Sequence, residues 1–285
     1  MHTALVISPH ADDAAAFCGA TLAKFAALGW RIVLVRVTDD ARDSMNLTAE
    51  DTIRVNTKEL HTAAKIMGIA EIEELGFPTD TLGDVSRVEL RERFVYLFRK
   101  HQPYAVFSFD PFGLHENNLD HTITAQAVDE AFWVSTFDKH HPEHFEEGLA
   151  PFSVCERWYF GRDLPSANHV EDVTEHIETC INALCAHKTM MRNTVNQLKL
   201  QAQTWGRRVP VIDAAVDGAL HPLLEQFLMA RAHTVAQSAG LPEGQYAELF
   251  RLERFGDLEP LMQALGEPID GARPAPRRAT FGEEA

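Results

Sequence analysis

The sequence predicts an α/β protein: a Rossmann-like, doubly wound and mostly parallel sheet with helices on both faces. Strand-like and helix-like segments alternate along the first half of the 285-residue chain, which is typical of repeated βα units. The expected strands contain uninterrupted apolar runs such as Leu5-Val6-Ile7, and strands buried on both faces have this pattern. The second half is expected to add a helical and strand-containing part to the same sheet.

The first half divides into segments of period two or of helical period, separated by turn residues. The expected strands are Thr3 to Ser8, Arg31 to Thr38, Glu71 to Leu75 and Tyr104 to Phe109. The expected helices are Cys18 to Leu28, Thr48 to Met67, Ser86 to His101 and Thr122 to Val134. Gly29 and Gly68 end two of these helices, and Thr48 with Asp51 resembles a capping box.

The second half is predicted in coarser terms. A loop is expected over His140 to Gly148, a strand over Phe152 to Phe160 and a long helix over Val170 to Leu200. Residues Trp205 to Arg254 are expected to be mostly helical, with breaks at glycines and prolines. We expect one domain over residues 1–255 and a C-terminal extension over 256–285, disordered from about Gly266.

Composition excludes several classes of partner. The formal net charge of −16 repels phosphate backbones and anionic membranes, so a nucleic-acid partner is not expected. No apolar run reaches membrane-spanning length, and because an apolar strand is expected directly after Met1, no signal peptide is expected. Because the four cysteines form no C-x-x-C pair, they are expected to be reduced thiols in a cytoplasmic protein. Homo-oligomerisation stays open.

Two polar motifs follow expected strands. Ser8-Pro9-His10-Ala11-Asp12-Asp13 comes after the first strand, and Asn118-Leu119-Asp120-His121 comes after the fourth. In the doubly wound strand order these two strands are neighbours, so both loops meet at one edge of the sheet. Imidazole and carboxylate groups suit zinc, and a catalytic zinc site needs three protein ligands with one open position. We therefore expect His10, Asp13 and His121 to bind a divalent metal.

Other residues of the motifs are left for chemistry or support. Asp12 is available as a base. Asp120 can orient an imidazole ring by accepting a hydrogen bond from the ring nitrogen that does not face the metal. Taken alone, the first motif is as readily explained by carboxylates that cap a helix in a solvated loop.

With these residues in place, the chain resembles the LmbE-like or PIG-L zinc deacetylases. The segment SPHADDAAAFCGATLAK is similar to the family's A-H-P-D-D-E motif and the small residues after it, and NLDH is similar to H-P-D-H. Arg54 lies in a helix segment similar to the family's R-x(4)-E pattern, and His187 ends one similar to A-x-x-A-H. Residues Tyr246 to Leu252 are similar to the Y-A-E-x-F-R strand, which revises that piece from helix to strand.

The resemblance implies removal of an acetyl or other acyl group from an N-acylated amino sugar or related small molecule. It implies Zn²⁺, or another divalent metal, bound by His10, Asp13 and His121. It implies that Asp12 is the base that activates the attacking water, with Asn118 and Asp120 also at the catalytic centre. It implies substrate contacts from Arg54 and His187.

The chain departs from the family at two positions. Ala14 replaces the Glu that follows D-D, and Asn118 replaces the first His of H-P-D-H. An Asn amide can donate a hydrogen bond but cannot act as an acid, so His115 is a candidate substitute. These departures motivate an alternative, a catalytically impaired protein of the same fold that binds metal and sugar.

The remaining candidate residues can also be explained without a functional role. A helix arginine such as Arg54 more often lies on a solvated face, and Asp39 and Asp40 are equally explained by a polar turn. The imidazole cluster His140, His141 and His144 suggests metal, but a mobile solvated segment explains it as well. A nucleotide-binding Rossmann protein is disfavoured, because the first strand-to-helix turn carries His and Asp where G-x-G-x-x-G would be expected.

Overall fold

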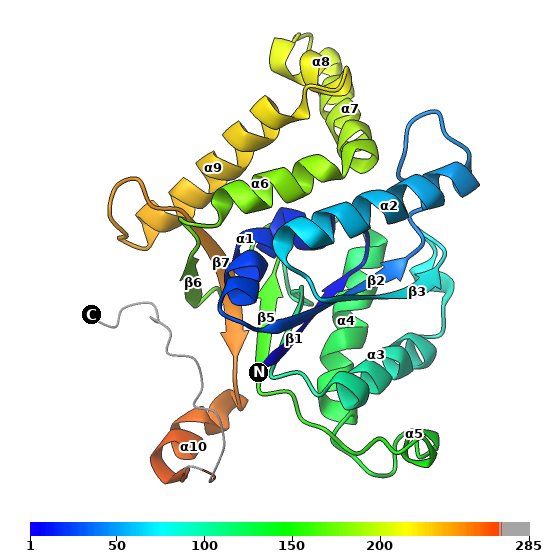
Figure 1. Ribbon diagram of the computed structural model, residues 1–285, viewed down its shortest axis with the longest axis vertical. Helices are drawn as coiled ribbons and strands as arrows, with labels where there is room; N and C mark the ends of the chain where they lie inside the picture. Colours follow the sequence, from blue (N-terminus) through cyan, green and yellow to red (C-terminus); the bar gives the residue numbers. More distant parts are fainter. Residues whose placement is uncertain (268, 270–285) are drawn as a thin grey trace.

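A seven-stranded sheet forms the centre of the protein, and its strands lie in the order β3-β2-β1-β4-β5-β7-β6 (Figure 1). The computed structural model describes residues 1–267 and residue 269. The strands are β1 Thr3–Ser8, β2 Arg31–Thr38, β3 Glu71–Phe77, β4 Ala105–Phe109, β5 Glu156–Phe160, β6 His169–Asp172 and β7 Ala247–Glu253. Strands β3, β2, β1, β4 and β5 are parallel, whereas β7 is antiparallel to both β5 and β6.

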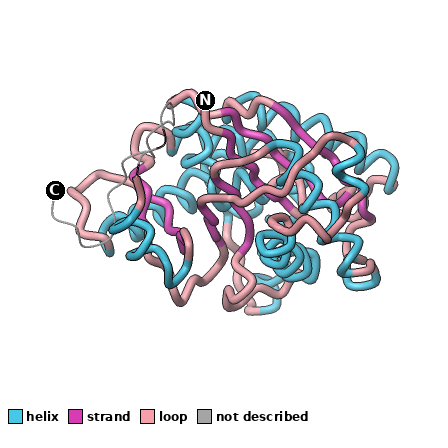
Figure 2. The backbone as a smooth tube through the Cα atoms, turned by 90° about the horizontal axis from the view of Figure 1, so that it is seen from below, coloured by secondary structure: helices cyan, strands magenta, loops and turns pink. Residues whose placement is uncertain are grey.

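Helices cover both faces of the sheet, as the tube view also shows (Figure 2). They are α1 Asp13–Ala27, α2 Ala49–Met67, α3 Arg87–His101, α4 Leu119–Val134, α5 Glu143–Glu146, α6 Ile177–Ala186, α7 Lys188–Thr204, α8 Pro210–Val216, α9 Leu220–Ser238 and α10 Glu259–Leu265. Short 3₁₀ turns occur at Leu82–Asp84 and Gly256–Leu258. Within the described residues, no helix combines the length and apolarity needed to cross a membrane.

Alternate residues of each central strand contribute to two separate cores. Ala4 and Val6 of β1 pack with α1, α2, α6 and α9 on one face, while Leu5 and Ile7 pack with α3 and α4 on the other. The first core extends to Phe250 of β7, so the C-terminal elements are built onto the same apolar cluster as the N-terminal ones. This two-sided burial explains why the strands are continuously apolar in sequence.

Strand β1 lies at the point where the chain changes direction across the sheet. It pairs with β2 on one side and with β4 on the other, both in parallel. The helices α1 and α4 begin just beyond the carboxyl ends of β1 and β4, so the two sequence motifs meet there. The predicted adjacency of the first and fourth strands is confirmed, as is the predicted fold class.

Helix α1 bends at Cys18, whose backbone leaves helical geometry with φ −147° and ψ 18°. The helix restarts immediately afterwards, and its first free amides need acceptors. Glu248 of β7 provides them, because its Oε1 accepts from the Ala20 N–H at 3.2 Å and its Oε2 from the Thr21 N–H at 2.9 Å. One carboxylate therefore fastens the second half of α1 to the antiparallel strand β7.

Several predicted boundaries were wrong. Helices α1 and α4 begin at Asp13 and Leu119, earlier than the predicted Cys18 and Thr122, because the motif carboxylates lie in their first turns. The predicted long helix from Val170 to Leu200 is instead strand β6 followed by α6 and α7, which meet at His187. The expected loop around residues 140–148 contains the short helix α5. The disorder expected from about Gly266 falls almost entirely outside the described residues.

Removing the cap at the bend should destabilise the fold. We expect Glu248→Ala to lower the free energy of unfolding by about 1–3 kcal/mol, because two amides of the fully buried residues Ala20 and Thr21 lose their acceptors. Glu248→Gln should cost less, since its single carbonyl oxygen can still accept. Denaturant unfolding measures both, with Glu243→Ala in an exposed turn as the control. Equal stability of Glu248→Ala and the wild type would contradict the capping role.

Candidate metal centre

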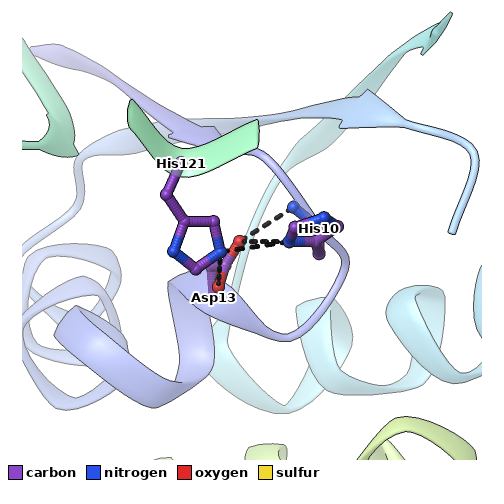
Figure 3. A group of neighbouring side chains, drawn as sticks. All are labelled: His10, Asp13 and His121. Atoms are coloured by element: carbon purple, nitrogen blue, oxygen red, sulfur yellow. Dashed lines mark hydrogen bonds and ion pairs between the residues drawn. The ribbon is translucent and has the colours of Figure 1, made fainter. Parts of the chain in front are cut away.

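His10, Asp13 and His121 converge at the carboxyl ends of β1 and β4 (Figure 3). His10 Nδ1 lies 3.1 Å from His121 Nε2 and 3.4 Å from Asp13 Oδ2, while His121 Nε2 lies 3.2 Å from Asp13 Oδ1. All three residues are at most 5% exposed. Three ligand atoms from two distant motifs thus face one point in a buried site.

The first motif is fixed by its own hydrogen bonds. Asp13 Oδ2 accepts from the His10 backbone N–H at 2.8 Å, and the Ser8 hydroxyl donates to the His10 carbonyl at 2.6 Å. Asp40, buried after β2, accepts from the Ala11 N–H at 3.3 Å and is itself paired with Arg36 at 3.0 Å. The turn that presents His10 and Asp13 is therefore supported from the neighbouring strand.

Each imidazole has a carboxylate behind it. His10 Nε2 lies 3.2 Å from Asp120 Oδ2, and His121 Nδ1 lies 3.1 Å from Glu116 Oε2. The Asp120 contact is a hydrogen bond, whereas His121 Nδ1 and Glu116 Oε2 lie at ion-pair distance without hydrogen-bond geometry. A proton on each outer nitrogen would leave a lone pair on each inner nitrogen, which is the arrangement found in metal-binding histidines. Asp120 also accepts from the backbone amides of Asp80 and Leu82, so it is held in place.

The electrostatics of the site depend on these close pairs. Burial disfavours the charge of His121, but Asp13 and Glu116 outweigh it and raise the pKa of His121 to about 9. The pKa of His10 is also raised despite burial, through Asp120 and Asp13. Burial opposes the charge of Asp13 as well, yet both imidazoles hold its pKa far below the usual range. Positive charge at this point is strongly favoured.

These residues fit a divalent metal ion. The inner nitrogens of His10 and His121 are 3.1 Å apart, and two facing ring nitrogens cannot both donate to each other. A cation bound by these residues would accept a lone pair from each nitrogen. Its positive charge would also offset the negative charge of the surrounding carboxylates. Two imidazoles and one carboxylate form a donor set typical of zinc, and they leave a fourth position open.

Asp12 lies next to the three ligands at the start of α1. Within the described residues its carboxylate makes no hydrogen bond or ion pair, unlike the carboxylates of Asp13 and Asp120. Burial and the adjoining Asp13 carboxylate raise the pKa of Asp12 to about 8. A carboxyl group with this pKa can gain and lose a proton near neutral pH.

Asn118 has a structural task. It is the N-cap of α4, and its Oδ1 accepts from the Asp120 N–H at 2.9 Å. This bond helps to present both Asp120 and His121 from the first turn of the helix. His115, the suggested substitute for an imidazole at position 118, is 79% exposed at its side chain and lies 3.7 Å from Asp163.

The two predicted substrate-contacting residues are not joined to the three ligands by any hydrogen bond or ion pair among the described residues. Arg54 lies on the exposed face of α2 and pairs with Asp51 at 2.8 Å. His187 is completely buried at the junction of α6 and α7, and neither ring nitrogen has a hydrogen-bond partner in the described chain. Burial lowers the pKa of His187 to about 4, although the charge of Asp13 acts on the ring in the opposite direction, which places His187 near the three ligands.

Sequence reasoning missed Glu116 and Asp43. Glu116 precedes His121 by five residues in the same loop, and that spacing was the available signal. Asp43 lies close enough for the charges of His10, Asp13 and Asp120 to act on it, and its Oδ2 has no hydrogen-bond partner among the described residues. Burial raises the pKa of Asp43.

The imidazole cluster near residue 140 is a separate feature. His144 Nε2 lies 2.9 Å from Glu92, and His144 Nδ1 lies 3.1 Å from the guanidinium of buried Arg99. Arg99 also donates to the backbone carbonyls of Ser135, Phe137 and His141. Both nitrogens of His144 are thus engaged in holding the α4–α5 connection, which favours a structural role.

Comparison with known proteins places the metal centre in a family context. The family described as PIG-L, GlcNAc-PI de-N-acetylase, matches residues 5–132, which include every residue of the two motifs. Over these residues the chain is similar to the PIG-L family.

Individual relatives extend the likeness beyond the matched segment. The chain is 26% identical over 196 residues to a diacetylchitobiose deacetylase of Thermococcus kodakarensis, covering 68% of this chain and 72% of the relative. It is also 26% identical over 202 residues to a probable N-acetyl-alpha-D-glucosaminyl L-malate deacetylase 2 of Bacillus anthracis, covering 68% and 84%. The structure of N,N'-diacetylchitobiose deacetylase from Pyrococcus horikoshii superposes with a TM-score of 0.71 at 22% identity, over 88% and 84% of the two chains. This structural similarity supports the α/β fold of the chain.

The role of Glu116 can be tested by titration. We expect Glu116→Gln to lower the pKa of His121 in the metal-free protein from its raised value of about 9, because one of the carboxylates that favour the imidazolium is neutralised. NMR titration of the His121 ring measures the change, with the exposed Asp138→Asn as a control for surface charge. An unchanged His121 titration would show that Asp13 alone sets this pKa.

Proposed function

We propose that the protein is a zinc-dependent amide hydrolase that removes an acetyl or other acyl group from an N-acylated amino sugar or related small molecule. One observation carries the proposal: an unpaired carboxylate, Asp12, stands beside three converging ligand atoms of His10, Asp13 and His121. A metal-binding trio with an adjacent base is the minimum needed for metal-assisted hydrolysis. The similarity of residues 5–132 to the PIG-L family supports this proposal.

Each residue has a distinct part in the proposed reaction. His10, Asp13 and His121 hold the ion, and Asp120 and Glu116 orient the two rings. When bound, the metal would polarise the amide carbonyl and lower the pKa of a water molecule. Asp12 takes the proton of the attacking water and returns a proton to the departing amine nitrogen.

The amine-bearing part of the substrate is proposed to be an N-acetylglucosamine unit or a close relative of it. The two curated relatives carry names of deacetylases that act on such sugars, one on diacetylchitobiose and one on a malate conjugate. Their names differ in what is attached to the sugar, so the attached group is the open part of the specificity.

Separate loss of metal and of turnover tests the roles. We expect His10→Ala to lose bound Zn²⁺, while Asp12→Asn should keep about one Zn²⁺ per chain and lose activity by about 10²–10⁴-fold, because only proton transfer is removed. Metal analysis and acetate release from N-acetylglucosamine and diacetylchitobiose provide the two readouts. Asp138→Asn, a change of an exposed carboxylate, is the matched control. Full activity of Asp12→Asn would exclude Asp12 as the base.

Proton release provides a second test of the metal centre. Because the pKa of His121 is raised to about 9 without metal, its ring carries a proton at pH 7 that a bound ion must displace. Zn²⁺ affinity should therefore rise as pH increases from about 6.5 towards 9, with release of about one proton or more at pH 7. Titration calorimetry in two buffers of different ionisation enthalpy measures this. Binding without proton release would show that the Zn²⁺ occupies another site.

A metal- and sugar-binding protein without turnover is the second candidate. The observation behind it is that Asn118 cannot act as an acid, and that its Oδ1 already accepts the Asp120 N–H as the cap of α4. Tight Zn²⁺ binding together with no acyl release from a broad panel of N-acyl amino sugars would favour it over the hydrolase.

A further inference from the structure

A cavity of about 480 Å³ lies at the carboxyl end of β5. Residues Gly161 to Leu164, which follow β5, line one side, and the first turns of α1 and part of α9 line the others. Much of the lining is apolar: Phe17, Leu164, Ile177, Leu228, Val235 and Leu249. The cavity is large enough for a ring or a short alkyl chain.

The cavity borders the proposed metal centre. Phe17 of its wall contacts Phe109 with ring centroids 4.8 Å apart, and Phe109 stacks on His121 at 4.1 Å. Arg162, also in the wall, lies 3.2 Å from Glu116, the partner of His121. The cavity therefore lies close to the metal ligands, with the Phe109 ring between its Phe17 wall and His121.

Four charged side chains line the cavity, and three have specific partners. Glu248 is bonded to the two amides that follow the bend of α1, and Arg162 is paired with Glu116. Asp163 is half exposed and faces His115. Arg231 of α9 is the remaining charge.

Arg231 has few partners for its five N–H groups. It donates to the Ala16 carbonyl at 3.4 Å and the Gly161 carbonyl at 3.3 Å, both long bonds, and its guanidinium lies 5.4 Å from the Phe17 ring. No carboxylate of the described chain lies within 4.0 Å of it. Burial lowers the pKa of Arg231, and the charge of Glu248 in the same wall acts in the opposite direction. The Glu248 oxygens accept from the Ala20 and Thr21 amides and form no ion pair with Arg231, so an anion that reaches the guanidinium would gain a charge-assisted hydrogen bond.

We propose that this cavity binds an apolar group that carries one negative charge, with Arg231 as the partner of the anion. Given the proposed hydrolase function, on which this assignment rests, the cavity is the subsite for the group attached to the amino sugar. The substrate would then be an N-acylated amino sugar linked to an apolar acid, with the amide at the metal centre and the acid beside Arg231.

Binding of a simple probe tests the cavity without any need for turnover. We expect 4-phenylbutanoate to bind the full-length zinc-loaded protein at least about tenfold more tightly than 4-phenylbutan-1-ol, because only the acid can pair with Arg231. Arg231→Gln should abolish this preference and leave alcohol binding unchanged. Arg207→Gln, an exposed arginine that contacts Trp205, is the matched control and should keep the preference.

A second variant guards against a folding defect in Arg231→Gln. Thr234 is exposed on α9 one turn after Arg231 and lines the same cavity. Thr234→Glu places a carboxylate where it can pair with Arg231 and compete with the probe, so binding of the acid should weaken about tenfold while binding of the alcohol stays. Equal binding of acid and alcohol to the wild type, or an unchanged preference in both variants, would overturn the proposal.

Turnover separates the subsite from the proposed function. With 4-carboxyphenyl and phenyl N-acetylglucosaminides, kcat/KM should favour the carboxylate about tenfold in the wild type and be equal in Arg231→Gln, and 4-phenylbutanoate should inhibit competitively. Turnover without this preference or competition would overturn the subsite assignment alone. No turnover of any N-acetyl substrate would instead overturn the proposed function, while the binding comparison would still decide the cavity.

Discussion

The structure depends on one electrostatic constraint: two buried imidazoles are surrounded by more carboxylates than they can neutralise. Asp13 lies between His10 and His121, and Asp120 and Glu116 lie behind them. Without a cation the imbalance is met by protons, which is why the pKa values of both imidazoles are raised. A divalent ion would replace these protons, so the same residues that favour protonation in its absence favour metal when it is present.

This arrangement requires that β1 and β4 be neighbours, and contacts from several other elements support the two loops that follow these strands. The parallel register of Ala4, Leu5 and Val6 with Ala105, Val106 and Phe107 brings the two motif loops to one edge. Around them, Asp40 supports the first turn, Asn118 caps α4, and Glu248 fixes α1 beyond its bend. The antiparallel end of the sheet thus acts on the site indirectly, through the helix that carries Asp13.

The convergence of His10, Asp13 and His121 was predictable from sequence because it follows from two short motifs and a general rule about neighbouring strands. The fold class was predictable for a similar reason, since two-sided burial leaves apolar runs in the sequence. Glu116 and the Glu248 cap were not, because they rest on side-chain contacts across loops and between segments more than 200 residues apart. Substrate contacts from Arg54 and His187 stay predictions. The residue pattern did not reveal that Arg54 is exposed on α2, nor that His187 is buried where the charge of Asp13 acts on it.

Asn118 has a further consequence for the proposed chemistry. Its Oδ1 is bound to the Asp120 amide, and an amide side chain cannot titrate, so this position holds the helix start but supplies no proton. His115 is exposed on the loop and His187 is buried in the core. Asp12 and Asp43 are carboxyl groups near the ligands whose pKa values are raised, and Asp12 directly precedes Asp13 in the chain. Burial and the charge of Asp13 raise the pKa of Asp12 to about 8, and a neighbouring cation would lower it. In the proposed reaction the same carboxyl group would serve as base in the attack of water and as acid in departure of the amine.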